Sequence, residues 1–184
     1  MKIRDMALCA LFAAVITVCS WITIPAAVPF TMQTFAVFLA GGLGGGKRAA
    51  ASVLVYVLLG AAGLPVFHGF TGGIGILLGS TGGYILGFIG AALTMWLFER
   101  LFGTGSLALA SGMAAGLAVC YIIGSLWFAA VYVKASGSVA LGQIVSWCVA
   151  PFVLPDLIKL ALALLAVKKL KKYVPSHMAP AKPQ

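Results

Sequence analysis

The segment MALCALFAAVITVCSWITI, residues 6–24, carries no charged side chain. Lys2 and Arg4 precede it, and it is longer than the apolar region of about 7 to 15 residues in a cleaved signal peptide. A membrane-spanning helix needs about 20 predominantly apolar residues. We therefore expect this segment to be a retained first membrane helix, and it decides the fold class.

The composition of the whole chain agrees with that expectation. Of the 184 residues, 62% are hydrophobic and only 8% are charged, whereas soluble domains average about 25% charged residues. This excludes a water-soluble globular protein. The length allows about six or seven spans and leaves no room for a soluble catalytic domain.

Glycines, prolines and charges divide the chain into six predicted spans. We expect an all-α integral membrane protein, a compact bundle of six transmembrane helices. The spans are predicted at about 6–24, 32–44, 47–64 (starting at Lys47 or Ala49), 84–101, 106–133 and 145–167. Pro65 to Gly79, rich in glycine, is predicted to form a structured or re-entrant extracellular loop. Residues 1–172 then form one membrane domain, and 173–184 a solvated C-terminal tail.

The positive charges orient the bundle. With six spans and a cytoplasmic N-terminus, ten of the 12 lysines and arginines face the cytoplasm. Lys134 faces outward, and Lys159 lies within a span. This bias is typical of the positive-inside rule and predicts that both termini are cytoplasmic.

Two ionisable residues lie deep in apolar sequence, in Val153-Leu154-Pro155-Asp156-Leu157-Ile158-Lys159-Leu160. Asp156 and Lys159, spaced i, i+3, share a helix face and can pair. A charge at the centre of a membrane helix costs at least about 2.5 to 3.5 kcal/mol, so such a pair indicates a functional site. The alternative is a neutralised pair that only sets helix packing. Pro151 and Pro155 free backbone carbonyls nearby.

Other kinds of site are poorly supported. Gly41 to Lys47 fits G-x-x-x-x-G-K, but Arg48 follows where a P-loop needs Ser or Thr for Mg²⁺. The four cysteines are single, without metal-ligand spacing, and His68 and His177 lie far apart in sequence. His68 is interpreted as a polar loop contact. We therefore expect no metal, no cofactor and no catalytic residues.

Several motifs in order resemble the BioY family, over about Lys2 to Lys172. They are Pro29-Phe30-Thr31-Met32-Gln33-Thr34-Phe35-Ala36-Val37-Phe38-Leu39-Ala40-Gly41, Gly45-Gly46-Lys47-Arg48, Gly60-Ala61-Ala62-Gly63-Leu64-Pro65-Val66-Phe67, Phe70-Thr71-Gly72-Gly73, Thr81-Gly82-Gly83-Tyr84 and Pro155-Asp156-Leu157-Ile158-Lys159. The chain departs from the family at Ser80, where Pro is common.

The resemblance implies a biotin-specific S component, the substrate-binding membrane subunit of an energy-coupling factor (ECF) transporter. Such a subunit binds biotin near its outward face and delivers it inward with a scaffold T component and two ABC-type ATPases. The resemblance also makes Ala10 and Ala14, a pair of small residues on the first helix, the expected scaffold-docking residues. The implied location is a bacterial cell membrane.

The residues suit biotin, whose ureido ring, apolar thioether ring and carboxylate need different partners. Asp156 can accept the ureido N–H groups, while Lys159 can neutralise either Asp156 or the ligand carboxylate. The other expected binding residues are polar side chains and aromatic walls: Thr31, Gln33, Tyr56, Thr71, Thr81, Tyr84, Phe30 and Phe67. Each of these could instead serve packing. The loop 65–79 is the expected gate.

Three alternatives stay open on the sequence. The first is a carrier for another vitamin, or a proton-coupled solute transporter that uses Asp156. The second is a membrane-embedded enzyme, which three acidic residues and two histidines in the whole chain make a poor fit. The third is an assembly subunit that binds no ligand.

Overall fold

The computed structural model describes residues 3–24, 28–137 and 140–173. The helices in these ranges are α1 (Ile3–Trp21), α2 (Gln33–Gly44), α3 (Gly46–Ala61), α4 (Ile74–Leu78), α5 (Gly82–Phe102), α6 (Ser106–Ser136), α7 (Leu141–Cys148) and α8 (Ala150–Leu170). One short 3-10 helix, η1 (His68–Phe70), precedes α4. Two short strands, β1 (Thr23–Ile24) and β2 (Phe30–Thr31), pair antiparallel, with Thr23 opposite Thr31.

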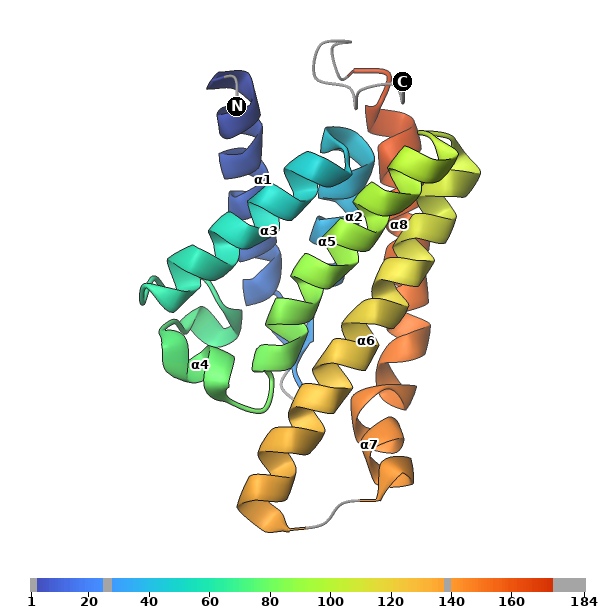
Figure 1. The fold of residues 1–184 in the computed structure, drawn as a ribbon. Coiled ribbons are helices and arrows are strands. Elements are labelled where there is room, and N and C mark those ends of the chain that lie inside the picture. The colour runs from blue at the N-terminus through green and yellow to red at the C-terminus, as the bar shows by residue number, and fades with distance from the viewer. Residues whose placement is uncertain (1–2, 25–27, 138–139, 174–184) are drawn as a thin grey trace.

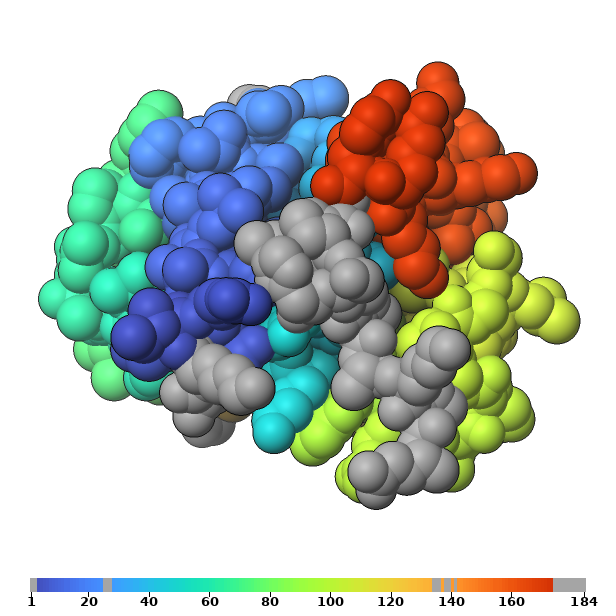
Figure 2. Space-filling view, turned by 90° about the horizontal axis from the view of Figure 1, so that it is seen from above, coloured from blue at the N-terminus to red at the C-terminus, as the bar shows by residue number. Residues whose placement is uncertain are grey.

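The longer helices run up and down in one bundle. Successive helices α1, α2, α3, α5, α6 and α8 alternate in direction, so α1 begins at the end of the bundle where α8 ends (Figure 1). Seen from that end, α1 and α3 lie at one side, and α8 with the ends of α5 and α6 lies at the other (Figure 2). The short helix α2 packs against both α1 and α8 and joins the two groups.

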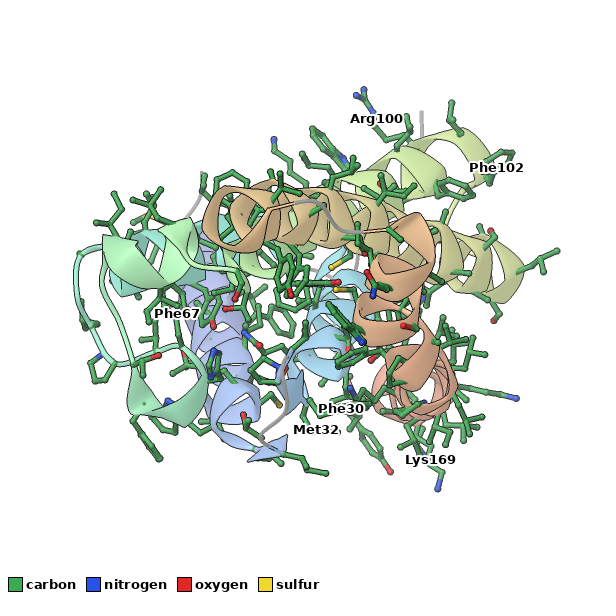
Figure 3. The ribbon with its side chains drawn as sticks, turned by 90° about the horizontal axis from the view of Figure 1, so that it is seen from below. Phe30, Met32, Phe67, Arg100, Phe102 and Lys169 are labelled. Carbon is green, nitrogen blue, oxygen red and sulfur yellow. The ribbon has the colours of Figure 1, made fainter. Side chains whose placement is uncertain are left out.

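The outer surface of the bundle is apolar. Large side chains such as Leu107, Leu126 and Leu154 are each more than 60% exposed, whereas Arg100 and Lys169, in the last turns of α5 and α8, project away from the bundle (Figure 3). Among the described residues, four stretches are long and apolar enough to cross a membrane: Ile3–Trp21, Gly82–Phe102, Ser106–Val133 and Gly142–Leu170. Helices α2 and α3 are shorter. The chain is a multi-pass membrane protein.

Helices α5 and α6 pack against each other along their length, because small residues let their backbones approach closely. A Cβ atom added at Gly116 would lie 2.9 Å from the carbonyl oxygen of Ala91, and one added at Gly87 would lie 3.1 Å from that of Cys120. Neither position has room for a larger residue. This hairpin forms one wall of the polar site described below.

The loop between α3 and α5 is ordered, as its sequence predicts. The hydroxyl of Ser20 donates to the carbonyl of Val66 (2.6 Å), and the amide of Gly73 donates to the carbonyl of Gly60 (2.7 Å). At the far end of the loop, the indole of Trp127 donates to the carbonyl of Gly79 (2.9 Å). The turn that contains Ser80 is thus held by α6.

Helix boundaries differ from the prediction at several positions. Helix α3 ends at Ala61 and not at 64, and α6 continues to Ser136 and not to 133. Two further differences have a local cause. The expected first span to residue 24 ends at Trp21, because the chain then enters β1. The expected last span of 145–167 is two helices, α7 and α8, with a break at Val149 (φ −125°, ψ −57°). Pro151 in the first turn of α8 explains the break, since proline has no N–H for the preceding turn. The predicted tail from residue 174 onward lies outside the described residues.

Candidate ligand-binding site

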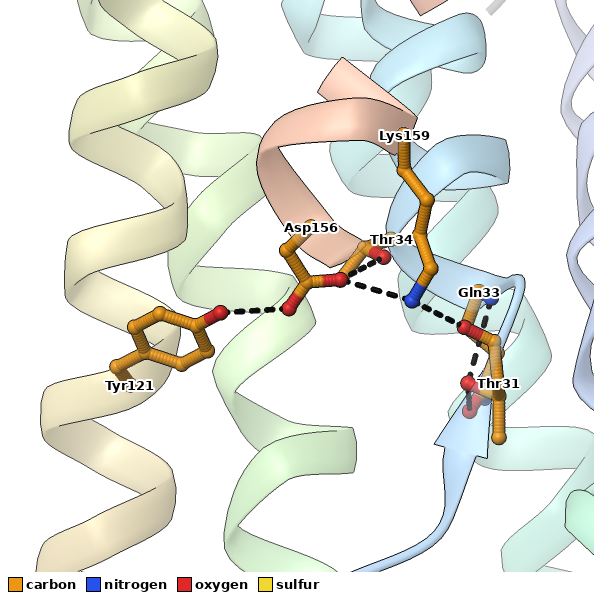
Figure 4. Close-up of polar contacts among 6 residues, drawn as sticks. All are labelled: Thr31, Gln33, Thr34, Tyr121, Asp156 and Lys159. Atoms are coloured by element: carbon orange, nitrogen blue, oxygen red, sulfur yellow. Dashed lines mark hydrogen bonds and ion pairs between the residues drawn. The ribbon is translucent and has the colours of Figure 1, made fainter. Parts of the chain in front are cut away.

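Asp156 and Lys159 of α8 lie at the centre of a hydrogen-bond cluster (Figure 4). Oδ1 of Asp156 accepts from Nζ of Lys159 (2.8 Å) and from the hydroxyl of Thr34 (2.9 Å), while Oδ2 accepts from the hydroxyl of Tyr121 (2.6 Å). Both charged side chains are buried. The three donors match an ionised carboxylate, which can only accept hydrogen bonds.

The ammonium of Lys159 also bonds to the turn between β2 and α2. Its Nζ donates to the main-chain carbonyl of Thr31 (2.7 Å) and lies 5.6 Å from the centre of the Phe30 ring. The backbone at this point turns from β2 into α2, with the amide of Met32 bonded to the carbonyls of Cys19 and Ile22. The Thr31 carbonyl is therefore left available for the lysine.

These residues border a cavity between the helices. Ligand sites for small molecules commonly have mostly apolar walls with a few polar groups. The walls of this cavity come from distant parts of the chain: Val28, Pro29, Thr31, Gln33, Thr34, His68, Thr81, Tyr84, Ile85, Phe88, Cys120, Tyr121, Phe152, Asp156 and Lys159. The cavity thus offers a polar end on α8 and apolar walls.

Six of the residues expected from the sequence line this cavity: Thr31, Gln33, Thr81, Tyr84, Asp156 and Lys159. Phe30 does not, but its ring stacks on that of the lining residue Phe152, with centroids 4.3 Å apart. The hydroxyl of Tyr84 donates to the carbonyl of Cys148 (3.0 Å), at the end of α7. Tyr84 thereby ties the break before α8 to α5.

Tyr56, Phe67 and Thr71 lie behind the lining. Tyr56 is fully buried, accepts a hydrogen bond from the side-chain amide of Gln33 (2.6 Å) and meets Phe67 edge-on at 5.5 Å. The hydroxyl of Thr71 donates to the carbonyl of His68 (2.8 Å). These three residues support Gln33 and His68, which do line the cavity.

Sequence reasoning missed two partners of Asp156. Thr34 is 122 residues away in sequence and Tyr121 is 35 away, so no local spacing links them to α8. The residue type could have indicated Tyr121, because a tyrosine hydroxyl within an apolar membrane helix needs a hydrogen-bond partner. His68, interpreted as a loop contact, also lines the cavity.

The fold and the site define a class: a small multi-pass membrane protein with a buried charged pair beside a cavity between its helices. Comparisons place it in a family. The family model of BioY matches residues 1–176. The biotin transporter BioY of Thermotoga maritima is 42% identical over 92% of this chain and 96% of its own length. The probable biotin transporter BioY of Pyrococcus horikoshii is 39% identical over 93% and 98%. The chain belongs to the BioY family.

A solved structure shares the fold. The S-component for biotin from an ECF-type ABC transporter superposes with a TM-score of 0.81, covering 93% of this chain and 92% of its own, at 24% sequence identity. At that identity the likeness establishes the fold.

Proposed function

We propose that this chain is the biotin-binding S component of an ECF-type ABC importer, which captures biotin outside the cell and delivers it inward. The observation that carries the proposal is the buried Asp156–Lys159 pair, which borders the cavity. Family membership and the names of the relatives support biotin as the ligand.

The chemistry of the cavity suits biotin. The carboxylate of Asp156 can accept from the two ureido N–H groups, and Lys159 or Tyr121 can donate to the ureido oxygen. The apolar rings of Phe88 and Phe152 flank this end and suit the thioether ring. Expected supporting residues are Gln33 and Tyr84, which line the same space.

The orientation of the bundle in the membrane is inferred from the charges. Lys47, Arg48, Arg100 and Lys168 all belong to the end of the bundle where α8 ends, and positive residues favour the cytoplasmic side. This supports six spans, both termini in the cytoplasm, and a cavity nearer the outer face of a bacterial plasma membrane. The loop 65–79 then forms the gate.

Delivery requires partners, and α1 offers a surface for one. Ala10 and Ala14 are exposed, one turn apart, and small residues permit close helix contact in a membrane. We assign this face to a scaffold T component that carries two ATPases. Ala10→Leu should abolish biotin uptake in cells that hold the whole transporter, while the purified variant still binds biotin. Ala130→Leu, at an exposed alanine of α6, is the matched control.

The proposal is tested by titrating the purified full chain in detergent with biotin. We expect saturable binding of about one biotin per chain, and loss of that binding in Lys159→Met. Lys169→Met, the same change at an exposed lysine of the same helix, should bind as the wild type does. A folded wild-type chain that binds no biotin would overturn the proposal and favour a carrier for another solute.

A further inference from the structure

The ammonium of Lys159 has one N–H group that the protein itself does not use. An ammonium carries three donors and no acceptor. Two of them are engaged by Oδ1 of Asp156 (2.8 Å) and by the main-chain carbonyl of Thr31 (2.7 Å). Among the described residues no hydrogen bond takes the third, and the Phe30 ring, whose centre is 5.6 Å from Nζ, is too far away to accept it. Since Lys159 lines the cavity, this N–H is available to a ligand.

The direction of the third N–H depends on Thr31. The three N–H bonds of an ammonium diverge tetrahedrally, so fixing two of them also fixes the third. Asp156 lies one turn before the lysine on the same helix, whereas Thr31 belongs to β2 and its carbonyl approaches Lys159 from outside α8. A shift of the Thr31 carbonyl would therefore redirect the third N–H even with the ion pair intact.

A chain of hydrogen bonds holds Thr31 in place. Its hydroxyl donates to Oε1 of Gln33 (2.8 Å) and accepts from the main-chain N–H of Gln33 (3.3 Å). At the other side of the amide, Nε2 of Gln33 donates to the hydroxyl of Tyr56 (2.6 Å). The chain thus connects the lysine, through two residues that line the cavity, to a tyrosine of α3 that lies behind the lining.

Tyr56 gives this chain a fixed end. Its side chain is fully buried, and its ring meets that of Phe67 edge-on, with centroids 5.5 Å apart. Phe67 is held in turn by Gly60, where its ring leaves no room for a Cβ atom. Two apolar side chains of the same shape as Tyr56 and Gln33 would pack here about as stably. The polar pair therefore indicates a role in positioning.

We propose that Tyr56 is a positioning residue, which through Gln33 and Thr31 sets the direction of the third N–H of the binding lysine. That N–H donates to the ureido oxygen of biotin, while Asp156 accepts from the ureido N–H groups. Tyr56 itself does not touch the ligand. This inference rests on the proposed function, because it assigns one contact of the same ligand.

The test compares biotin with 2-thiobiotin, in which sulfur replaces the ureido oxygen. Sulfur is a weak hydrogen-bond acceptor, so this analogue keeps both ureido N–H groups but gains little from the lysine. Both compounds are titrated into the purified full chain in detergent. In Tyr56→Phe the affinity for biotin should fall roughly three- to tenfold, while that for 2-thiobiotin changes little. Tyr132→Phe, at a tyrosine whose hydroxyl has no hydrogen bond among the described residues, should keep the wild-type preference for biotin.

A second pair of variants tests whether Tyr56 acts through Gln33. Gln33→Met breaks the same chain one link nearer the lysine, so the preference for biotin over 2-thiobiotin should fall. The double variant Tyr56→Phe/Gln33→Met should lower it no further, because both changes interrupt one chain. The double variant removes the tyrosine hydroxyl and the amide together and leaves neither unpaired. Its comparison with Gln33→Met therefore decides the question even where Tyr56→Phe alone does not fold.

The outcomes separate the two proposals. Equal weakening of biotin and 2-thiobiotin in Tyr56→Phe overturns the positioning role and leaves the transport function standing, because the change then does not act on the ureido oxygen. A wild-type preference in Tyr56→Phe, a further loss in the double variant, or a wild-type chain that binds both compounds equally overturns the positioning role as well. Failure of the folded wild type to bind biotin overturns both proposals.

Discussion

Two ion pairs of similar length have different surroundings in this molecule. Asp156 and Lys159 are 2.8 Å apart on α8, with side chains 5% and 11% exposed. Asp5 of α1 and Arg48 of α3 are 2.9 Å apart near the end of the bundle, with side chains 25% and 21% exposed. The first pair borders the cavity, whereas the second joins two helices at the surface. Burial and the adjoining cavity, and not distance, distinguish the pair that we propose to bind the ligand.

The largest effect is expected from leaving one member of the buried pair alone. Lys159→Met removes the ammonium from Asp156 and leaves a buried carboxylate without its counter-charge. Breaking a buried pair in this way costs about 3 to 5 kcal/mol. The melting temperature of the variant in detergent should fall well below that of Lys169→Met. Equal melting temperatures would show that the carboxylate does not need its partner.

The next largest effect is expected from removing the hydrogen bond that the Tyr121 hydroxyl donates to Asp156. Tyr121→Phe keeps the ring and removes one hydrogen bond to a charged group, which is worth about 1.5 to 3 kcal/mol. We expect weaker biotin binding and a lower melting temperature. Tyr132→Phe on the same helix is the control, because the Tyr132 ring stacks on Phe128 and its hydroxyl has no hydrogen bond among the described residues. Equal changes in biotin binding and melting temperature in the two variants would show that Tyr121 does not contribute to the site.

A smaller loss is expected at Thr34. Thr34→Val keeps the shape of the side chain and removes a donor to Asp156, and interhelical hydrogen bonds in membranes average about 0.6 kcal/mol. Biotin affinity should fall by roughly threefold. Thr94→Val, whose hydroxyl bonds only within its own helix at the carbonyl of Gly90, should leave the affinity unchanged. A loss in both variants would indicate a general effect of the substitution.

The smallest effect is expected at the surface pair. Asp5→Asn should change the melting temperature little, because partly exposed pairs contribute about 0 to 1 kcal/mol. High salt should reduce even that difference, since exposed charges are screened. Thermal unfolding at two salt concentrations measures it. A loss as large as that of Lys159→Met would contradict the distinction between the pairs.

The sequence predicted the apolar helices well and the irregular segments poorly. The hydrophobic run of α5 was expected at 84–101 and extends over Gly82–Phe102, because long apolar stretches have few alternatives in a membrane. The two-residue strands β1 and β2 were not foreseen, since so short a segment carries no periodic pattern. Pro151 indicated a loosened helix, but the complete break at Val149, next to the Cys148 carbonyl that accepts from Tyr84, was not predicted.

The polar site was predictable where its residues are close in sequence. Asp156 and Lys159 were found from their spacing, and Thr31 and Gln33 from the resemblance. Thr34 and Tyr121 were not, because their contacts with Asp156 depend on how α2 and α6 pack against α8.

The most direct test of the account is the biotin affinity of Asp156→Asn beside that of Asp5→Asn, each in the purified full chain. Both variants lose one carboxylate charge and keep its size. The account predicts that Asp156→Asn weakens biotin binding at least about 30-fold, equivalent to about 2 kcal/mol or more, while Asp5→Asn binds as the wild type does. Equal affinities in the two variants would contradict the assignment of the buried pair to the ligand.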